Sequence, residues 1–436
     1  GAAVSAHADL SHLPGVGVEP GESTNFRVHG VVPAIVAAPE SAKAAAAVLA
    51  LASERGWQVE IAGRGGCLES GRPPRGGQVD VLLTTARLDA LAEYAPADLT
   101  VTAGAGMTLG RLEATLAQSG QFLPLDPAGA AGATLGAVVA RGDAGPLRLG
   151  YGTPRDHVLG LELVTGDGRV LQLGGRVMKN VAGYDLTRLV VGSRGTLGLI
   201  TRVTARLRPL PRADRTLALR SSVAQACVSA ARAIRQERLE PVAMEILSPE
   251  ASARVAAAGA WTLLLRLHGP AGAVDELAPR VERIAAGEGR AVETLEPEAA
   301  AVAWSTLSTL EAQAALVIRL AALPGELGRT LSLAQEVADA GGWSDGARVA
   351  HAGDGIVRVL GPAAADAPAW GDVAAAVERA RLTLSPAGGT VVIARAPAEL
   401  MQRIDPFGYV GAATLMEGIR RTFDPAGVLS PGRFAI

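Results

Sequence analysis

Three glycine-rich stretches could bring backbone N–H groups close to a phosphate group or a flat ring. In the first, GRGGCLESG (63–71), the lack of side-chain bulk lets N–H groups converge on an anion just after an apolar segment. Its spacing differs from the GxGxxG of dinucleotide-binding folds, and no helix pattern follows at once. A surface turn is an equally good interpretation of this stretch alone. Its candidate binding residues are Gly63, Arg64, Gly65, Gly66 and Cys67.

The second stretch, GAAGATLGAVVA (129–140), predicts the start of a helix. Small residues there leave the first N–H groups of the helix accessible, and the helix dipole favours an anion at that end. Close packing of a buried helix rich in alanine and glycine explains the same pattern equally well. The candidate binding residues are Ala133, Thr134 and Gly136.

The third stretch, GRVMKNVAGYDLTRLVVGSRGTLGLI (175–200), runs into an apolar, β-branched segment. Its last glycines are spaced by three, so a planar ligand could approach the backbone closely. A lysine–asparagine pair earlier in the stretch could meet phosphate or ring oxygens, although a lysine at a loop edge is more often simply solvated. The candidate residues are Lys179, Asn180, Gly192, Gly195, Gly198 and Ile200.

The charge balance and the cysteines exclude several classes of protein. With 41 basic and 43 acidic residues, scattered along the chain, we expect no nucleic-acid partner. Cys67 and Cys227 are far apart and fit no disulfide, iron–sulfur or zinc spacing. No stretch reaches the roughly 20 apolar residues of a membrane helix, and residues 1–20 lack a secretory pattern. We expect a cytoplasmic protein with no transmembrane segment and no metal site.

The periodicity of apolar residues predicts the elements that position these stretches. A length of 436 residues is too great for one ordinary core. The first half predicts a strand-rich α+β unit: strand, helix and strand over 34–63, strands at 80–85 and 98–106, a helix at 107–120 and a hairpin at 158–173. From about residue 212, short strands alternate with Ala-rich amphipathic helices, which indicates a second domain.

Taken in order, these segments resemble the flavin-binding subunit of bacterial glycolate oxidase, within the FAD-linked oxidases related to vanillyl-alcohol oxidase. The resemblance covers residues 30–211 and 405–436. It is carried by VVPAIVAAPES, PADLTVTAGAGMTLGRLEATLAQSGQFLPLDP, ATLGAVVA, the block from RLGYGTPRDHVLG to ARLRPLP, and the tail FDPAGVLSPGRF. The block GRVMKNVAGYDLTRLVVGSRGTLGLIT is specific to this type of subunit.

The resemblance implies an α+β fold in which a PCMH-type FAD-binding domain is built from two α/β subdomains. A second α+β domain, the cap, has an antiparallel sheet. The implied divisions are an N-terminal extension (1–30), the FAD-binding domain (31–211), the cap domain (212–404) and a C-terminal segment (405–436) that packs back on the FAD-binding domain. FAD would be bound non-covalently, its pyrophosphate at the 63–67 loop and the ATLG turn, and its adenosine near Gly192 to Ile200.

The implied function is that of a FAD-dependent oxidoreductase subunit in a hetero-oligomeric complex that oxidises a small 2-hydroxy acid such as glycolate or lactate. Electrons would come from the substrate or from a catalytic flavoprotein subunit and pass to an iron–sulfur subunit. The complex would be cytoplasmic or peripheral to the inner face of the membrane. No catalytic residue can be assigned. The alternatives are a scaffold subunit without chemistry and a self-sufficient FAD-linked alcohol oxidoreductase.

Two departures from the family pattern bear on these alternatives. Where the family usually has GGGTKL, this chain has GRGGCL (63–68), and a loop altered in this way is what a scaffold subunit would show. His351 lies in HAGDGIV, which resembles the HxGDGN loop of the catalytic partner subunits. The Asn-x-His continuation that would supply metal ligands is interrupted by Ile356 and Val357, so we predict no metal there.

Overall fold

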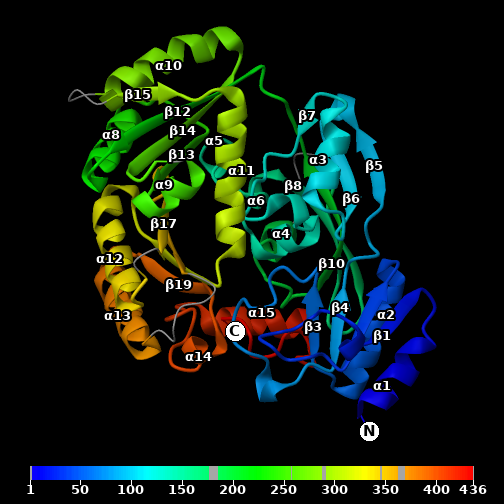
Figure 1. Ribbon diagram of the computed structural model, residues 1–436. Coiled ribbons are helices and arrows are strands. Elements are labelled where there is room, and N and C mark those ends of the chain that lie inside the picture. The colour runs from blue at the N-terminus through cyan, green and yellow to red at the C-terminus, as the bar shows by residue number, and fades with distance from the viewer. Residues whose placement is uncertain are drawn as a thin grey trace. The chain divides into compact units, whose positions relative to one another are not determined.

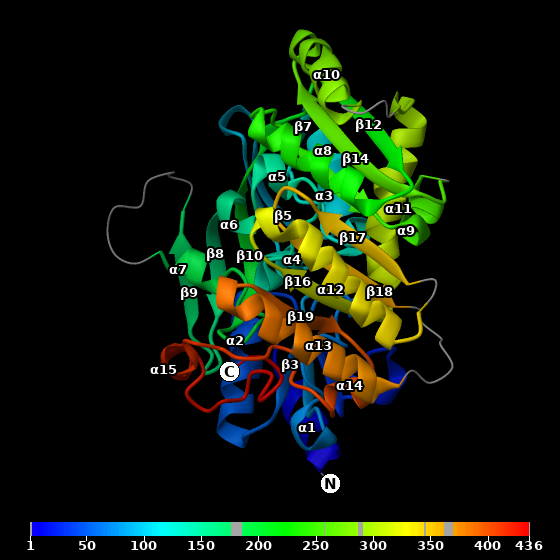
Figure 2. The same cartoon turned by 90° about the vertical axis from the view of Figure 1, so that its left-hand side faces the viewer.

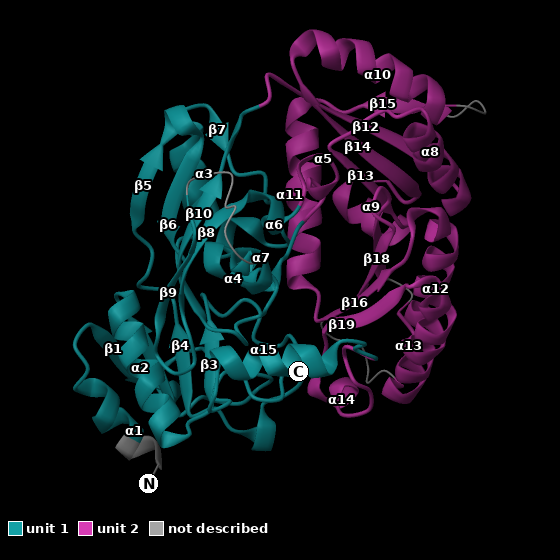
Figure 3. Ribbon diagram, turned by 180° about the vertical axis from the view of Figure 1, so that it is seen from behind, with its two compact units in different colours: residues 1–144, 153–210, 409–436 teal, residues 145–152, 211–408 magenta. Residues whose placement is uncertain are grey.

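The computed structural model describes residues 2–175, 185–256, 258–286, 291–343, 346–361 and 369–435. Contacts within the described chain divide it into two compact units, coloured separately in Figure 3. Unit 1 contains Gly1–Ala144, Thr153–Leu210 and Tyr409–Ile436, and unit 2 contains Gly145–Gly152 and Pro211–Gly408. The short helix α5 (Arg148–Tyr151) thus belongs to unit 2, whereas the sequence predicts one uninterrupted domain over 31–211.

Unit 1 contains two main sheets and the helices that cover them (Figure 1). Its strands are β1 (Val16–Pro20), β2 (Ile35–Pro39), β3 (Val59–Ala62), β4 (Val81–Thr84), β5 (Leu91–Ala95), β6 (Thr100–Gly104), β7 (Gln121–Phe122), β8 (Val158–Val164), β9 (Val170–Gly174), β10 (Leu199–Arg206) and β11 (Arg208–Pro209). Its helices are α1 (Ala2–Ser11), α2 (Ala42–Arg55), α3 (Leu109–Ala117), α4 (Leu135–Arg141), α6 (Pro154–His157), α7 (Leu186–Val190) and α15 (Ala413–Phe423).

The first sheet of unit 1 has the strand order β1-β2-β4-β3. Strands β2, β4 and β3 are parallel, and β1 is antiparallel to β2. Val81, Leu82 and Leu83 of β4 are fully buried, the continuous apolar run that a central parallel strand requires. Strand β1 lies in the segment 1–30 that we expect to be an extension, so part of that segment completes this sheet.

Helix α2 connects β2 to β3 and has sequence signals at both ends. The Ser41 hydroxyl accepts a hydrogen bond from the Ala44 N–H at 3.1 Å, and Gly56 ends the helix with a left-handed φ of 67°. Val48 and Leu49 point from its buried face into a core shared with β2, β3 and β4. The chain therefore returns to the sheet as β3, from whose end the first glycine-rich loop continues.

The second sheet of unit 1 is antiparallel, with the order β5-β6-β10-β8-β9. Leu112 and Leu116 of α3, together with Leu135 and Val139 of α4, pack into the core of this sheet. The predicted helix at 107–120 corresponds to α3, and the predicted hairpin at 158–173 corresponds to β8 and β9.

Unit 2 is built on one antiparallel sheet with the order β15-β12-β14-β13-β17-β18-β16-β19. Its strands are β12 (Ala213–Ser221), β13 (Ala243–Leu247), β14 (Trp261–Gly269), β15 (Val292–Thr294), β16 (Leu316–Ala321), β17 (Ala347–His351), β18 (Ile356–Gly361) and β19 (Thr390–Arg395). Besides α5, its helices are α8 (Ala224–Gln236), α9 (Pro249–Val255), α10 (Ala271–Ala286), α11 (Pro297–Gln313), α12 (Leu327–Ala340), α13 (Trp370–Leu384) and α14 (Ala398–Met401).

The two faces of the unit 2 sheet are covered by different helices. Helices α8, α10, α12 and α13 contribute to the larger core, and Figure 2 shows α12 and α13 lying across the strands. Helices α9 and α11 contribute to a smaller core on the opposite face. Alternate residues of each strand enter the two cores, as the two-residue period of a strand dictates.

Candidate functional site

The first glycine-rich loop begins directly after β3, and its turn depends on Gly65. Gly65 has a φ of +88°, which glycine adopts without the strain that a Cβ would add. Outside glycine, left-handed backbone within the described residues occurs at His29, Leu99, Arg194, Arg238 and Ser430, so Arg64 has ordinary backbone geometry. The arginine that departs from the family pattern is therefore accommodated, with its side chain exposed to solvent.

The N–H groups of this loop are free to bind an anion. Among the described residues, no hydrogen bond of the chain uses the N–H groups of residues 64–67 as donors. The loop is held by its other groups, since the Thr84 hydroxyl donates to the Gly63 carbonyl at 2.6 Å and the Ser70 N–H donates to the Cys67 carbonyl at 3.1 Å. A Cβ at Gly66 would meet open space, so the loop faces outward there.

The second stretch forms the predicted helix, α4, but the N–H groups at its start are already engaged. The Leu135 and Gly136 N–H groups donate to the Met107 and Ala105 carbonyls, each at 2.8 Å. The Ala137 N–H donates to the Thr134 hydroxyl at 3.4 Å. Within the described chain, the donors of this turn that no hydrogen bond uses are the Thr134 N–H and the Thr134 hydroxyl proton, rather than the first N–H groups of the helix.

Close packing accounts for the small residues of the same turn. A Cβ at Gly136 would lie 2.6 Å from the Ala105 Cβ, too close for any larger residue. A Cβ at Gly63 would lie 2.3 Å from the Thr134 hydroxyl oxygen, so the first loop and this turn touch. Ala133 is half-buried beside the same contact.

In the third stretch, one of the three spaced glycines presents open backbone. Gly192 is exposed, has a φ of +88° and has no atom of the described residues within 4 Å of a Cβ position. By contrast, a Cβ at Gly198 (φ +148°) would lie 2.5 Å from the Val164 carbonyl oxygen, so internal packing explains that glycine. Gly195 has a left-handed φ of +80°, which favours glycine, and a Cβ there would make an ordinary contact of 3.5 Å with Ile61.

The remaining candidate binding residues of the third stretch are Ile200, Lys179 and Asn180. Ile200 is 4% exposed, within β10 and the second core of unit 1. Lys179 and Asn180 lie outside the residues that the structure describes.

The structure brings the three stretches together at the end of β3. Gly63 touches Thr134, and Gly195 packs on Ile61, two residues before Gly63. The Gly192 N–H donates to the Val139 carbonyl of α4 at 3.1 Å. Segments more than a hundred residues apart in the sequence therefore border one region of unit 1.

Two hydroxyl groups at this region have no partner within the described chain, and sequence reasoning missed both. Thr85 is 4% exposed, and its N–H donates to the Ala62 carbonyl at 2.9 Å, which fixes it beside the first loop. The Ser193 hydroxyl oxygen is buried next to Gly192. Buried polar atoms without partners are costly, and a phosphate or ribose oxygen would satisfy them. Free loop N–H groups, these hydroxyls and the exposed Arg64 fit a cofactor that carries a pyrophosphate.

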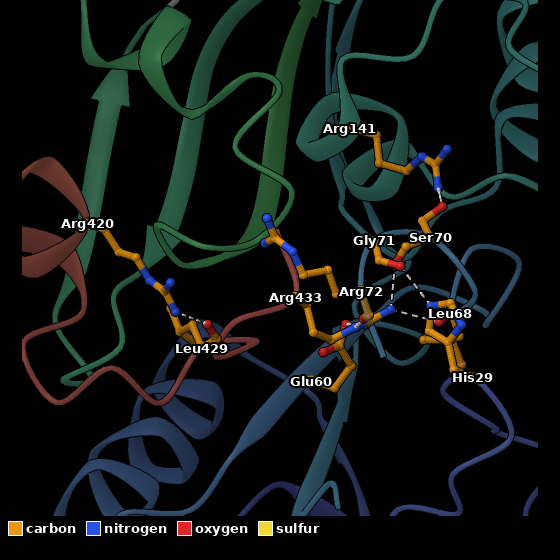
Figure 4. A network of polar contacts seen from close by, with 10 residues as sticks. All are labelled: His29, Glu60, Leu68, Ser70, Gly71, Arg72, Arg141, Arg420, Leu429 and Arg433. Atoms are coloured by element: carbon orange, nitrogen blue, oxygen red, sulfur yellow. Dashed lines mark hydrogen bonds and ion pairs between the residues drawn. The ribbon is translucent and has the colours of Figure 1, made fainter. Parts of the chain in front are cut away.

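A buried ion pair supports the residues that follow the loop (Figure 4). Arg433, near the C-terminus, is 2% exposed and pairs with Glu60 of β3. Its guanidinium also donates to the Leu68 carbonyl at 2.8 Å, the Ser70 carbonyl at 2.5 Å and the Arg72 carbonyl at 3.0 Å. Burial raises the pKa of Glu60, and the charge of Arg433 opposes that shift.

Two further side chains hold the same segment from the other side. The His29 ring nitrogen Nε2 lies 3.0 Å from the Gly71 carbonyl, and burial, together with the charge of Arg433, lowers the pKa of His29 to about 4. The Arg141 guanidinium, at the end of α4, donates to the Ser70 hydroxyl at 2.9 Å. Nothing local in the sequence indicates these contacts, because the partners are far apart along the chain.

In unit 2, His351 lies in a buried polar group with Glu245 and Arg358. Its Nδ1 contacts the Glu245 carboxylate and its Nε2 contacts the Arg358 guanidinium. An arginine only donates, so Nε2 accepts and Nδ1 carries the proton. Burial, then the charge of Arg358, lowers the pKa of His351 well below its usual value. Both ring nitrogens are engaged, and the described residues contain no group of three His, Cys, Asp or Glu suited to a metal ion.

None of the helices in the described part of the chain is both long enough and apolar enough to cross a membrane.

Comparison with known proteins assigns both units. A model of the FAD binding domain matches residues 33–174, and a model of the C-terminal domain of FAD linked oxidases matches residues 210–394. Glycolate oxidase subunit GlcE of Escherichia coli (strain K12) is 44% identical over 157 residues, which are 36% of this chain and 44% of that protein. The chain therefore spans less than half of the length of that relative in the match.

Two other comparisons cover nearly the whole chain. D-2-hydroxyglutarate dehydrogenase of Xanthomonas citri pv. viticola is 30% identical over 448 residues, covering 92% of this chain and 89% of that protein. The crystal structure of p-cresol methylhydroxylase with substrate bound has a TM-score of 0.77 at 16% identity, and covers 99% of this chain and 96% of that one. The latter likeness concerns the fold.

Fold and site together define a FAD-binding protein: a PCMH-type FAD-binding domain accompanied by a second α+β domain with an antiparallel sheet. The α+β fold and the FAD cofactor expected from the sequence are thereby confirmed. The chain belongs to the FAD-linked oxidase family, and its resemblance to glycolate oxidase subunits is confirmed as well.

Proposed function

We propose that this chain is the FAD-binding subunit of a complex that oxidises a small 2-hydroxy acid of the glycolate or lactate type. The observation that carries the proposal is the set of free N–H groups at residues 64–67, gathered with Thr85, Thr134 and Gly192 at one region of unit 1. The names of the relatives, a glycolate oxidase subunit and a D-2-hydroxyglutarate dehydrogenase, supply the substrate class.

Each part of the site has a distinct role in this proposal. The N–H groups of the 63–67 loop, with the positive charge of Arg64, hold the pyrophosphate. The hydroxyls of Thr85, Thr134 and Ser193 donate to phosphate or ribose oxygens. Gly192 lets the adenosine lie against the backbone, and its packed neighbours fix that segment. When bound, FAD supplies the redox chemistry, while the protein orients it and sets its electrostatic surroundings.

The proposal also covers the choice of substrate and the electron acceptor. Unit 2 matches the C-terminal domain of FAD linked oxidases, and we assign substrate selection to it. We propose that a separate iron–sulfur subunit receives the electrons. The word "subunit" in the name of the Escherichia coli relative supports such a complex, either cytoplasmic or peripheral to the membrane.

A charge placed in the loop tests the cofactor site. Gly66→Asp adds a carboxylate where a Cβ meets open space, so the fold is preserved while a negative charge opposes the phosphates. Juxtaposed like charges cost several kcal/mol, so we expect FAD affinity to fall on the order of 100-fold. Affinity is measured by titrating the FAD-free chain and following flavin fluorescence.

The matched control is Gly371→Asp, the same change at an exposed glycine of unit 2 that also has open space around it. It should leave FAD affinity unchanged. Equal affinity of Gly66→Asp and the unaltered chain would remove the loop from the site. An unaltered chain that is colourless and takes up no FAD would contradict the proposal itself and favour a scaffold subunit.

Substrate and partners need a second experiment. The chain is purified from its native cells with the proteins bound to it, and these are identified by mass spectrometry. Reduction of a dye by the isolated chain with a 2-hydroxy acid would show that no partner is required. Reduction only in the presence of an iron–sulfur chain is the expected result.

A further inference from the structure

We propose that the C-terminal tail, residues 424–434, sets the affinity and the release rate of FAD by positioning the 63–72 segment and the 192–195 segment. Arg433 and Phe434 act as positioning residues in this proposal and do not themselves touch the cofactor. The inference rests on the proposed FAD site and adds to it a device that controls cofactor retention.

The tail is attached to the strand that leads into the loop. The Val59 N–H of β3 donates to the Val428 carbonyl, and the Ser430 N–H donates to the Val59 carbonyl, both at 2.8 Å. The Asp424 carboxylate accepts the Val428 N–H at 3.0 Å and the Leu429 N–H at 2.9 Å. The tail therefore pairs with the exposed edge of the first sheet of unit 1, right beside the loop.

One guanidinium then organises the segment after the loop. Arg433 donates to the carbonyls of Leu68, Ser70 and Arg72 and pairs with Glu60, as Figure 4 shows. Without this side chain two buried carbonyls, one half-buried carbonyl and a buried carboxylate would lose this partner, which is costly. The tail therefore holds the backbone of residues 68–72 in place.

Phe434 connects the tail to the third glycine-rich stretch as well. A Cβ at Gly71 would lie 2.9 Å from the Phe434 ring, so the ring packs on the first segment. The Arg194 guanidinium lies 5.8 Å from the centre of the same ring, within cation–π distance. Since Arg194 is two residues from Gly192, one ring contacts both of the segments that border the proposed site.

Backbone strain marks the same place. His29, Arg194 and Ser430 have φ values of 48°, 56° and 42°, and each lies in or against the tail or the segments that it contacts. Left-handed backbone at residues other than glycine is strained and persists where the surroundings hold it. When the tail undocks from β3, the backbone of these residues can relax. The 63–72 and 192–195 segments can then change conformation as well.

Coupling of this kind is reciprocal. If a docked tail raises FAD affinity by some factor, bound FAD must stabilise tail docking by the same factor, commonly between about 5-fold and 150-fold. This symmetry separates a positioning role from a purely structural one, because a tail that only stabilises the fold would dock equally well with and without FAD.

The experiment replaces the buried ion pair by apolar residues of similar size, Glu60→Leu with Arg433→Met, so that no charge is left unpaired. Removing both charges together avoids an unpaired buried charge, so the remaining cost is that of the carbonyls of Leu68, Ser70 and Arg72, which lose their donor. We expect the FAD dissociation constant to rise about 10-fold, and FAD to leave correspondingly faster. The matched control is Glu250→Leu with Arg348→Met, which removes the 3.1 Å ion pair of unit 2 and should change neither quantity.

Hydrogen exchange of residues 424–434 in the unaltered chain supplies the reciprocal measurement. Tail amides that exchange faster than those of β4, and therefore through local undocking of the tail, should slow on addition of FAD by a factor comparable to the affinity lost in the double variant. Equal tail exchange with and without FAD, or equal FAD affinity of the double variant and its control, would overturn the inference. A chain that binds no FAD would instead overturn the proposed function.

If the double variant does not fold, Phe434→Leu keeps the ion pair and removes the aromatic contact with Arg194. Its FAD affinity should fall, and unchanged affinity would count against the proposal.

Discussion

At the residue scale, the distinctive feature of unit 1 is a group of titratable side chains buried around the end of the chain. Glu60 and Arg433 are 373 positions apart in the sequence, and His29 is separated from Gly71 by 42. Partners so distant leave no local pattern, so the sequence alone predicts neither contact. The sequence does predict the glycine-rich loop between Glu60 and Gly71. The turn of that loop needs a left-handed φ at Gly65, which favours glycine and so leaves a local pattern in the sequence.

His29 should make the stability of unit 1 depend on pH. Its pKa falls from 6.5 to about 4 on folding, chiefly by burial and then by the charge of Arg433. As the pH falls, His29 therefore binds a proton at a higher pH in the unfolded chain than in the folded chain. The contribution of His29 to the free energy of unfolding is present above pH 6.5 and is lost between pH 6.5 and about 4. We expect His29→Asn, which tolerates the left-handed backbone, to reduce this loss.

The measurement is the thermal unfolding midpoint of both proteins at neutral pH and near pH 4. The difference between the two midpoints should be smaller in the variant. Other groups titrate in both proteins, so their contribution cancels in the comparison. Identical differences would show that His29 does not titrate in this way.

At the element scale, predictions succeed where an element has a local pattern. The hairpin at 158–173 and the helix at 107–120 appear as β8–β9 and α3. Strand β5 is missing from the predicted elements because its residues, which are exposed or half-buried, have no alternating apolar pattern. Gly198 shows the limit of such predictions, because a glycine required by close packing on the protein looks the same in the sequence as a glycine that admits a ligand.

The turn of that hairpin supports the tail, which leads to a prediction for Gly166→Ala. A Cβ at Gly166 would lie 2.3 Å from the Asp424 carboxylate oxygen, so the added methyl group must displace the carboxylate that accepts the Val428 and Leu429 N–H groups. Overpacking of this kind costs about 1 to 3 kcal/mol. Denaturant unfolding should show a lower midpoint. Gly175→Ala, whose new methyl group has no described residue within 4 Å, is the control, and equal midpoints for the two variants would contradict the prediction.

At the scale of the whole molecule, each unit has its own buried cores, and the proposed FAD site lies within unit 1. A ligand that binds only the folded state suppresses unfolding by mass action. At a free FAD concentration of about 100 times the dissociation constant, amides that exchange through unfolding of unit 1 should therefore slow about 100-fold. Hydrogen exchange read by mass spectrometry can follow β4 and β8 for unit 1, and β14 and β16 for unit 2. Because FAD gains its binding energy from unit 1, the strands of unit 2 should exchange at nearly the same rate with and without FAD. Equal slowing in both sets of strands would show instead that the two units unfold as one cooperative body. Slowing confined to the strands of unit 2 would show that FAD binds unit 2 and would contradict the proposed site.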